Sequence, residues 1–124
     1  MTPRTVLLRQ IHPNFYPNGQ LTSQAFLPFP KDHGKPSVYD GDQISPADAY
    51  VHYTTVLKNL SCCVWGVNCT EVSNVGLSSA PDPLPGFPSH ALIDFSGRTD
   101  KECRKLAKQL KDFALKRGCL HSPA

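Results

Sequence analysis

The first run of hydrophobic positions along the chain predicts a β-strand. Residues 4–11 are rich in aliphatic and β-branched side chains and end just before Pro13, a context that favours extended backbone. Asn18-Gly19 is a strong local signal for a hairpin turn, so residues 21–28 could return as a second strand. Several prolines then fragment the chain, and residues 37–39 predict only a short edge strand.

Two later segments carry the period of an amphipathic helix. Ser45 is a preferred N-cap residue and Pro46 suits the first helical position, so a helix is predicted from there to about residue 58. A second helix is predicted from a cap at Thr99 or Asp100 to a stop at Gly118. Its apolar positions recur at helical spacing and include Cys103, Leu106, Ala107, Leu110, Phe113 and Ala114.

The segments between these helices predict further strands. Residues 62–68 hold the only tryptophan and indicate a buried central strand, and residues 70–76 indicate a single helical turn. Closely spaced prolines in residues 78–89 exclude a central strand there, and residues 90–95 predict another strand. The sum is one α+β domain over residues 1–124, with a small, mostly antiparallel sheet of four or five strands and two α-helices packed on one face.

Composition restricts the class of protein. The chain has 124 residues, of which 40% are hydrophobic and 19% charged, and this suits one globular domain with a core of its own. No apolar run approaches the roughly 18 residues of a membrane-spanning helix, and the N-terminus lacks the pattern of a secretory leader. We therefore expect a soluble, cytoplasmic protein with no membrane partner.

The five cysteines agree with that expectation. An odd number is untypical of a secreted disulfide framework, and no pair has the CxxC spacing of a zinc site. Cys62 and Cys63 are adjacent on a predicted strand, so their side chains should point to opposite faces and pair poorly. We expect reduced, mostly buried thiols, and we predict no metal and no other cofactor.

Positive charge is concentrated in residues 99–124. The cations there include Lys101, Arg104, Lys105, Lys108 and Lys111, which spread over the side of the last predicted helix opposite its apolar stripe. Such a face could bind the phosphates of a nucleic acid without sequence preference. No aromatic residue lies among these cations and no nucleic-acid motif is present, so a solvated helix face is the simpler interpretation.

Residues able to carry acid–base or nucleophilic chemistry gather mainly in residues 11–42. The chain has no G-x-S-x-G motif, no P-loop and no dinucleotide fingerprint. A small hydrolase or transferase would need a histidine that meets a hydroxyl or a carboxylate within hydrogen-bond reach. The candidates for such a site at the sheet edge are His12, Ser23, Asp32, Asp40 and His90. Structural histidines and turn-forming aspartates are the alternative interpretation.

Aromatic side chains lie in two proline-stiffened segments, residues 12–42 and 78–89. Long irregular segments are uncommon unless they bind something or are disordered, and a high aromatic content argues against disorder. Rigid aromatic rings are good anchors for a partner, because little entropy is lost on binding. The candidate binding residues are Phe15, Tyr16, Phe29, Tyr39 and Phe87. The alternative is that these rings complete the core.

Three hypotheses of function follow. The first is a protein-interaction module that binds a protein partner through the aromatic surface of residues 12–42 and 78–89. The second is a small hydrolase or transferase, and the third is nucleic-acid binding through the basic C-terminal helix. The sequence leaves open whether the protein is an enzyme.

Overall fold

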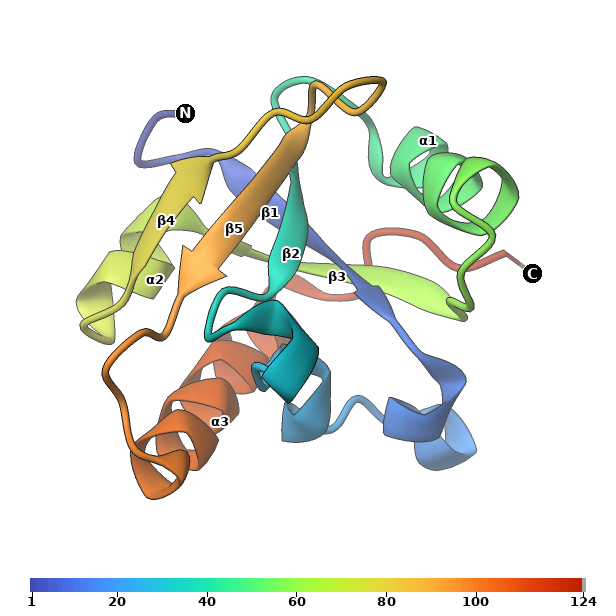
Figure 1. Cartoon of the computed structure of the whole chain (residues 1–124). Coiled ribbons are helices and arrows are strands. Elements are labelled where there is room, and N and C mark those ends of the chain that lie inside the picture. Colours follow the sequence, from blue (N-terminus) through green and yellow to red (C-terminus); the bar gives the residue numbers. More distant parts are fainter. Residues whose placement is uncertain (124) are drawn as a thin grey trace.

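The computed structural model describes residues 1–123 and has an α+β fold built on one five-stranded antiparallel sheet (Figure 1). The predicted fold class is confirmed. The strands lie in the order β3-β1-β2-β5-β4. Their bounds are β1 (Val6–Ile11), β2 (Ser37–Asp40), β3 (Cys63–Asn68), β4 (Ser78–Pro81) and β5 (His90–Asp94).

β1 organises the sheet because it is buried on both of its faces. It pairs with β3 at six consecutive positions, from Val6 opposite Asn68 to Ile11 opposite Cys63. Successive side chains of a strand point to opposite faces. Leu7 therefore enters one hydrophobic cluster and Leu8 another, and each leucine is at most 2% exposed.

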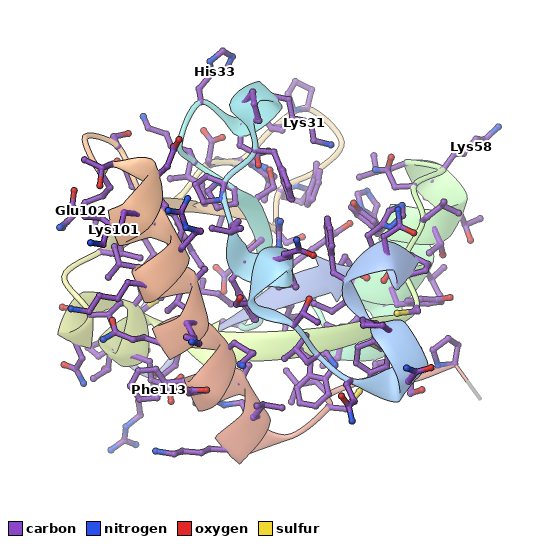
Figure 2. The ribbon with its side chains drawn as sticks, turned by 90° about the horizontal axis from the view of Figure 1, so that it is seen from below. Lys31, His33, Lys58, Lys101, Glu102 and Phe113 are labelled. Carbon is purple, nitrogen blue, oxygen red and sulfur yellow. The ribbon has the colours of Figure 1, made fainter. Side chains whose placement is uncertain are left out.

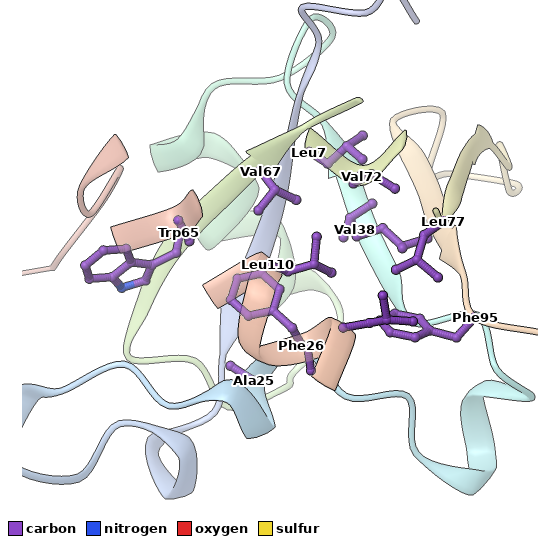
Figure 3. Packing of buried hydrophobic residues seen from close by; sticks show 14 of the residues in the cluster. Leu7, Ala25, Phe26, Val38, Trp65, Val67, Val72, Leu77, Phe95 and Leu110 are labelled. Atoms are coloured by element: carbon purple, nitrogen blue, oxygen red, sulfur yellow. The ribbon is translucent and has the colours of Figure 1, made fainter. Parts of the chain in front are cut away.

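α3 (Asp100–Arg117) covers one face of the sheet. The Thr99 hydroxyl accepts a hydrogen bond from the Glu102 N–H, and the Glu102 carboxylate accepts one from the Thr99 N–H, so the helix begins with a capping box. The helix packs against the sheet and against the 3-10 helix η3 (Ser23–Phe26). Figure 3 shows Leu110 beside Phe26 in this cluster. The buried residues of α3 are Cys103, Leu106, Ala107, Leu110 and Ala114.

α1 (Pro46–Val51) begins where the sequence predicts, because the Ser45 hydroxyl accepts a hydrogen bond from the Asp48 N–H. It continues directly into a π-helix, η5 (His52–Val56). Ala49 is buried with Leu8 and Tyr39, on the face of the sheet opposite α3 (Figure 1). In this respect the structure differs from the expectation of both helices on one face. Each face of the sheet has helical cover because β1 carries apolar side chains on both.

The segment after β1 also differs from expectation, since no hairpin forms at Asn18-Gly19. Short 3-10 helices follow one another instead: η1 (Pro13–Phe15), η2 (Pro17–Gly19), then η3. Proline is suited to the start of a helical turn, where its missing N–H costs nothing. Residues 21–28 therefore form no strand, and η3 buries Ala25 and Phe26 under α3 instead.

Two strands occupy other positions than predicted. β2 was expected at an edge, yet it lies between β1 and β5. β3 was expected at the centre, yet it is a terminal strand whose outer edge is met by a bridge between Val64 and His121. Burial on both faces made residues 62–68 resemble a central strand, although strand neighbours lie on one side only. α2 (Cys69–Asn74) and β5 agree with the sequence analysis. β4 is a strand that was not predicted, although its place at the edge of the sheet agrees with the exclusion of a central strand from residues 78–89.

A helix that crosses a bilayer must be both long and apolar. In the part of the chain that the structure describes, no helix combines the length and apolar character needed to cross a membrane.

Leu110 provides a test of the α3 packing. It is fully buried, so Leu110→Ala should lower the free energy of unfolding by about 2–5 kcal/mol, through lost burial and the cavity left behind. Leu115 lies on the same helix and is 47% exposed, so Leu115→Ala should change it by no more than about 0.5 kcal/mol. Urea denaturation followed by circular dichroism measures both. Equal effects of the two substitutions would contradict this packing.

Candidate functional site

A pocket of about 580 Å³ lies where β1 separates from β2. The ladder between these strands contains only two residue pairs, Leu7 with Asp40 and Leu8 with Tyr39. Beyond Leu8, β1 continues along β3 while β2 continues along β5, and side chains of both strands line the pocket. Its volume is in the range of small-molecule sites.

His90 meets a hydroxyl and a carboxylate at this pocket. Its Nε2 lies 2.9 Å from Ser37 Oγ. Its Nδ1 lies 2.8 Å from the main-chain carbonyl oxygen of Asp82 and 3.2 Å from Asp82 Oδ2. His90 is 8% exposed, whereas Ser37 is exposed, and both line the pocket. The three side chains have the connectivity of a Ser-His-Asp triad.

The register of the sheet explains why these residues meet. His90 lies opposite Tyr39 of β2, and Ser37 is two positions from Tyr39, so Ser37 and His90 are diagonal neighbours on one face. On the other side of β5, the Asp82 N–H donates to the His90 carbonyl at 2.9 Å, which extends the β4–β5 pairing by one residue. Three neighbouring strands therefore position the site.

The partners of His90 determine where its proton resides. Nδ1 faces a carbonyl oxygen and a carboxylate oxygen, which are both acceptors, so Nδ1 must carry the hydrogen. Nε2 of the neutral ring is then an acceptor, and the Ser37 hydroxyl donates to it. In this arrangement an imidazole can take the proton of a serine hydroxyl as its oxygen attacks an electrophile.

A tight turn brings Phe87 against the imidazole. Leu84 and Phe87 exchange two main-chain hydrogen bonds, of 3.0 and 2.8 Å, around Pro85-Gly86. Gly86 has a φ of 70°, which suits the third position of a type II turn, and proline is favoured at the second. The ring centroids of Phe87 and His90 are 4.9 Å apart. Phe87 therefore shields one side of His90 from water.

Tyr39 makes a second polar contact next to the same ring. Its hydroxyl lies 2.7 Å from Nδ1 of His52, the first residue of η5. Burial raises the pKa of Tyr39, and the neighbouring Tyr53 adds to the effect, so the phenol stays protonated next to His52. π-Helical turns are frequent at functional sites, and here η5 brings Tyr53 to the pocket.

The pocket contains three of the five predicted catalytic candidates: His12, Asp32 and His90. Ser23 lies in η3 and does not line it. Asp40 does not line it either, because its carboxylate accepts hydrogen bonds from the Asp42 N–H and from Gln43 Nε2 and so closes a turn.

Four of the five predicted binding residues line the same pocket: Phe15, Phe29, Tyr39 and Phe87. Phe15 and Phe29 are stacked, with ring centroids 5.5 Å apart and an interplanar angle of 11°. Tyr16 instead contacts Trp65, at 6.3 Å between centroids. Within residues 1–123, none of these five rings is among the exposed large hydrophobic side chains. They face a pocket or the core rather than open solvent.

The cations suggested for nucleic-acid binding lie on the outer side of α3. Lys101, Arg104, Lys105 and Lys108 are exposed and Lys111 is partly exposed. Figure 2 shows Lys101 at the periphery of the molecule. Their accessibility suits a solvated helix face as well as contact with phosphates.

The cysteines are free thiols, and two of them are closer than expected. Cys62 Sγ lies 3.7 Å from Cys63 Sγ, because β3 begins only at Cys63 and strand alternation does not apply to Cys62. Burial raises the pKa of the Cys63 thiol to about 12, and the nearby Cys62 adds to the rise. In the described chain no cluster of three or more His, Cys, Asp or Glu side chains is arranged to hold a metal ion.

Sequence reasoning missed Ser37, Asp82 and Arg9. The Arg9 guanidinium donates from Nε to the Ala25 carbonyl at 2.8 Å and from Nη1 to the Ser37 carbonyl at 2.6 Å. Strand alternation alone places Ser37 and Tyr39 on one face. Alternation does not show which strands lie next to β2, because these pairings join segments that are far apart in the sequence.

The chain was also compared with known proteins. No protein-family model, no curated protein and no solved structure matches it.

Alkaline pH should destabilise the fold through Cys63. An unfolded thiol loses its proton near pH 9, whereas the folded Cys63 thiol keeps it until about pH 12. In this interval the folded state binds more protons than the unfolded state, so the free energy of unfolding falls as pH rises. Cys63→Ala should make that fall shallower, as measured by urea denaturation under reducing conditions from pH 8 to roughly pH 10.5.

Cys119→Ala is the matched control, because this thiol is exposed. It should leave the pH dependence of stability as steep as in the wild type. A Cys63→Ala variant whose stability falls as steeply as that of Cys119→Ala would refute the role given to Cys63.

Proposed function

We propose that the protein is a small hydrolase or acyl transferase with Ser37 as its nucleophile. The observation that carries the proposal is the pair of contacts at His90, to the Ser37 hydroxyl on one side and to Asp82 on the other, at the wall of a pocket. A serine hydroxyl is a weak nucleophile unless a base accepts its proton, and His90 Nε2 is positioned to do so.

The reaction would proceed through an acyl-enzyme. Ser37 Oγ attacks the carbonyl carbon of an ester or amide while its proton passes to His90 Nε2, and the carbonyl oxygen becomes an oxyanion. The bond to the leaving group then breaks, and His90 returns the proton to that group. Water or another acceptor releases the acyl group by the same steps in reverse. Asp82 stabilises the imidazolium that forms in between.

The strand geometry offers a donor for the oxyanion. In antiparallel strands the N–H and the carbonyl of one residue point to the same side. The Ser37 carbonyl points toward Arg9, so the Ser37 N–H faces that side too, where β1 has already left the ladder. Main-chain N–H groups aimed at a developing oxyanion are a major source of catalysis in acyl transfer.

The lining suggests the size and polarity of the acyl group. Phe15, Phe29 and Phe87 supply apolar surface, and the volume of about 580 Å³ suits a small molecule or one long side chain. An apolar or aromatic moiety attached to the scissile carbonyl would be desolvated against these rings.

Binding of a protein partner is the second candidate, favoured by the rim of the pocket. Leu57 and Leu84 line it and are 39% and 44% exposed. Apolar side chains at a rim can receive part of a partner that inserts a side chain into the pocket. Such binding would persist in a Ser37→Ala variant, whereas acyl transfer would not.

Covalent labelling with a fluorophosphonate tests the proposal most directly, because the probe reacts with activated serines. The wild type should be labelled on Ser37, as located by peptide mass spectrometry. His90→Gln should slow labelling by roughly a thousandfold or more, since the base is lost. Hydrolysis of a panel of nitrophenyl esters should fall in parallel, including in Ser37→Ala.

Ser23→Ala is the matched control, since Ser23 lies outside the pocket. It should be labelled and should hydrolyse esters like the wild type. Absence of labelling on Ser37 in the folded wild-type protein would refute the proposal, as would labelling that is indifferent to His90→Gln.

A further inference from the structure

Arg9 places a cation in the pocket without an ion-pair partner. Its guanidinium donates to two main-chain carbonyls, of Ala25 and Ser37, and a guanidinium has more N–H groups than these two bonds use. Among residues 1–123 it forms no ion pair. Burial lowers the pKa of Arg9, which is the effect expected of a cation withdrawn from water without full compensation.

The next residue, Gln10, contributes an unused donor. Gln10 is 8% exposed, and its side-chain oxygen accepts a hydrogen bond from Ser61 Oγ at 2.8 Å. Its Nε2 has no hydrogen-bond partner in the part of the chain that is described. Buried polar atoms without partners are rare in native proteins, and a missing ligand is one of their ordinary explanations. Gln10 lines the same pocket as Arg9 and Ser37.

The charges around the pocket favour an anion. Arg9 and Lys31 are cations that line it, and Asp32 is the one acid found there among the described residues. Asp32 Oδ2 accepts a hydrogen bond from the Phe29 N–H, at 2.8 Å, and forms no ion pair with Arg9. Its charge opposes that of Arg9 without neutralising it by contact.

We infer that this pocket binds a carboxylate or phosphate group of the substrate through Arg9 and Gln10, next to the ester or amide bond that Ser37 attacks. Because Arg9 Nη1 is bonded to the main-chain carbonyl of Ser37, an anion on the remaining guanidinium N–H groups lies next to the backbone of the nucleophilic residue, in the pocket that Ser37 also lines. A planar guanidinium matches the two oxygens of a carboxylate or phosphate. Gln10 follows Arg9 on β1 and points to the other face, so its amide contributes a further bond from the opposite side of the opening between β1 and β2. The inference rests on the proposed function, since the anion is assigned to the substrate of Ser37.

The test is a titration of the intact ¹⁵N-labelled protein, followed by NMR at constant ionic strength. Inorganic phosphate and succinate are the probes, and the neutral succinamide is the control ligand. Phosphate, succinate or both should cause saturable shifts of the Arg9 Nε–H and Gln10 side-chain amide signals, whereas succinamide should not. The probe that binds more tightly identifies phosphate or carboxylate as the group recognised.

Variants assign the binding to these residues. Arg9→Lys and Gln10→Leu should each weaken it by roughly tenfold or more, because each loses hydrogen bonds to a charged ligand. Asp32→Asn should tighten it, because an opposing charge is removed while the amide oxygen can still accept from the Phe29 N–H. This gain keeps the test valid if Arg9→Lys does not fold. Lys108→Gln removes a cation on the outer side of α3 and should bind like the wild type.

The outcomes separate this inference from the proposed function. Ser37→Ala should bind the anion as tightly as the wild type, since the donors are untouched. Absence of saturable shifts, or equal weakening by Lys108→Gln and Gln10→Leu, would overturn the anion site even if Ser37 is labelled by the fluorophosphonate. Anion binding without labelling of Ser37 would support the anion-binding residues and remove the serine chemistry.

Discussion

The burial of β1 on both faces is the constraint from which the architecture follows. Leu7 and Leu8 point in opposite directions, so α3 must cover one side of the sheet and α1 the other. β1 keeps a six-residue ladder with β3 but only a two-residue ladder with β2. The opening that results is occupied by the Arg9 side chain, whose Nη1 donates to the Ser37 carbonyl that a longer ladder would have satisfied. The pocket and the two-sided core therefore both follow from the position of β1 in the sheet.

The chemistry of the candidate site depends on strand register. Ser37, His90 and Asp82 lie across β2, β5 and the end of β4, so a slip of one residue in either ladder would turn a side chain to the other face. Register in this sheet is specified by buried side chains on both faces. The burial that fixes the register therefore also determines which three residues meet at the site.

Local signals along the chain were sufficient for the helix starts. Ser45-Pro46 and Thr99 cap their helices through bonds within a few residues, and such bonds leave a pattern in the sequence. The place of β2 between β1 and β5 depends on contacts between distant segments and leaves no such pattern. The same holds for the site. His90 stood out as a candidate by residue type, whereas Ser37 and Asp82 become its partners only through the strand order.

His90 Nδ1 has two acceptors, the main-chain carbonyl and the carboxylate of Asp82. The presence of both determines what a substitution of Asp82 would change. An exchange of the aspartate for another residue would leave the imidazole in the same tautomer, because the carbonyl belongs to the backbone and every residue type provides it. Such an exchange would remove only the negative charge next to the ring. Substitutions of Asp82 should therefore change how strongly His90 attracts a proton. The orientation of the imidazole should stay the same, because the backbone of the strand fixes it.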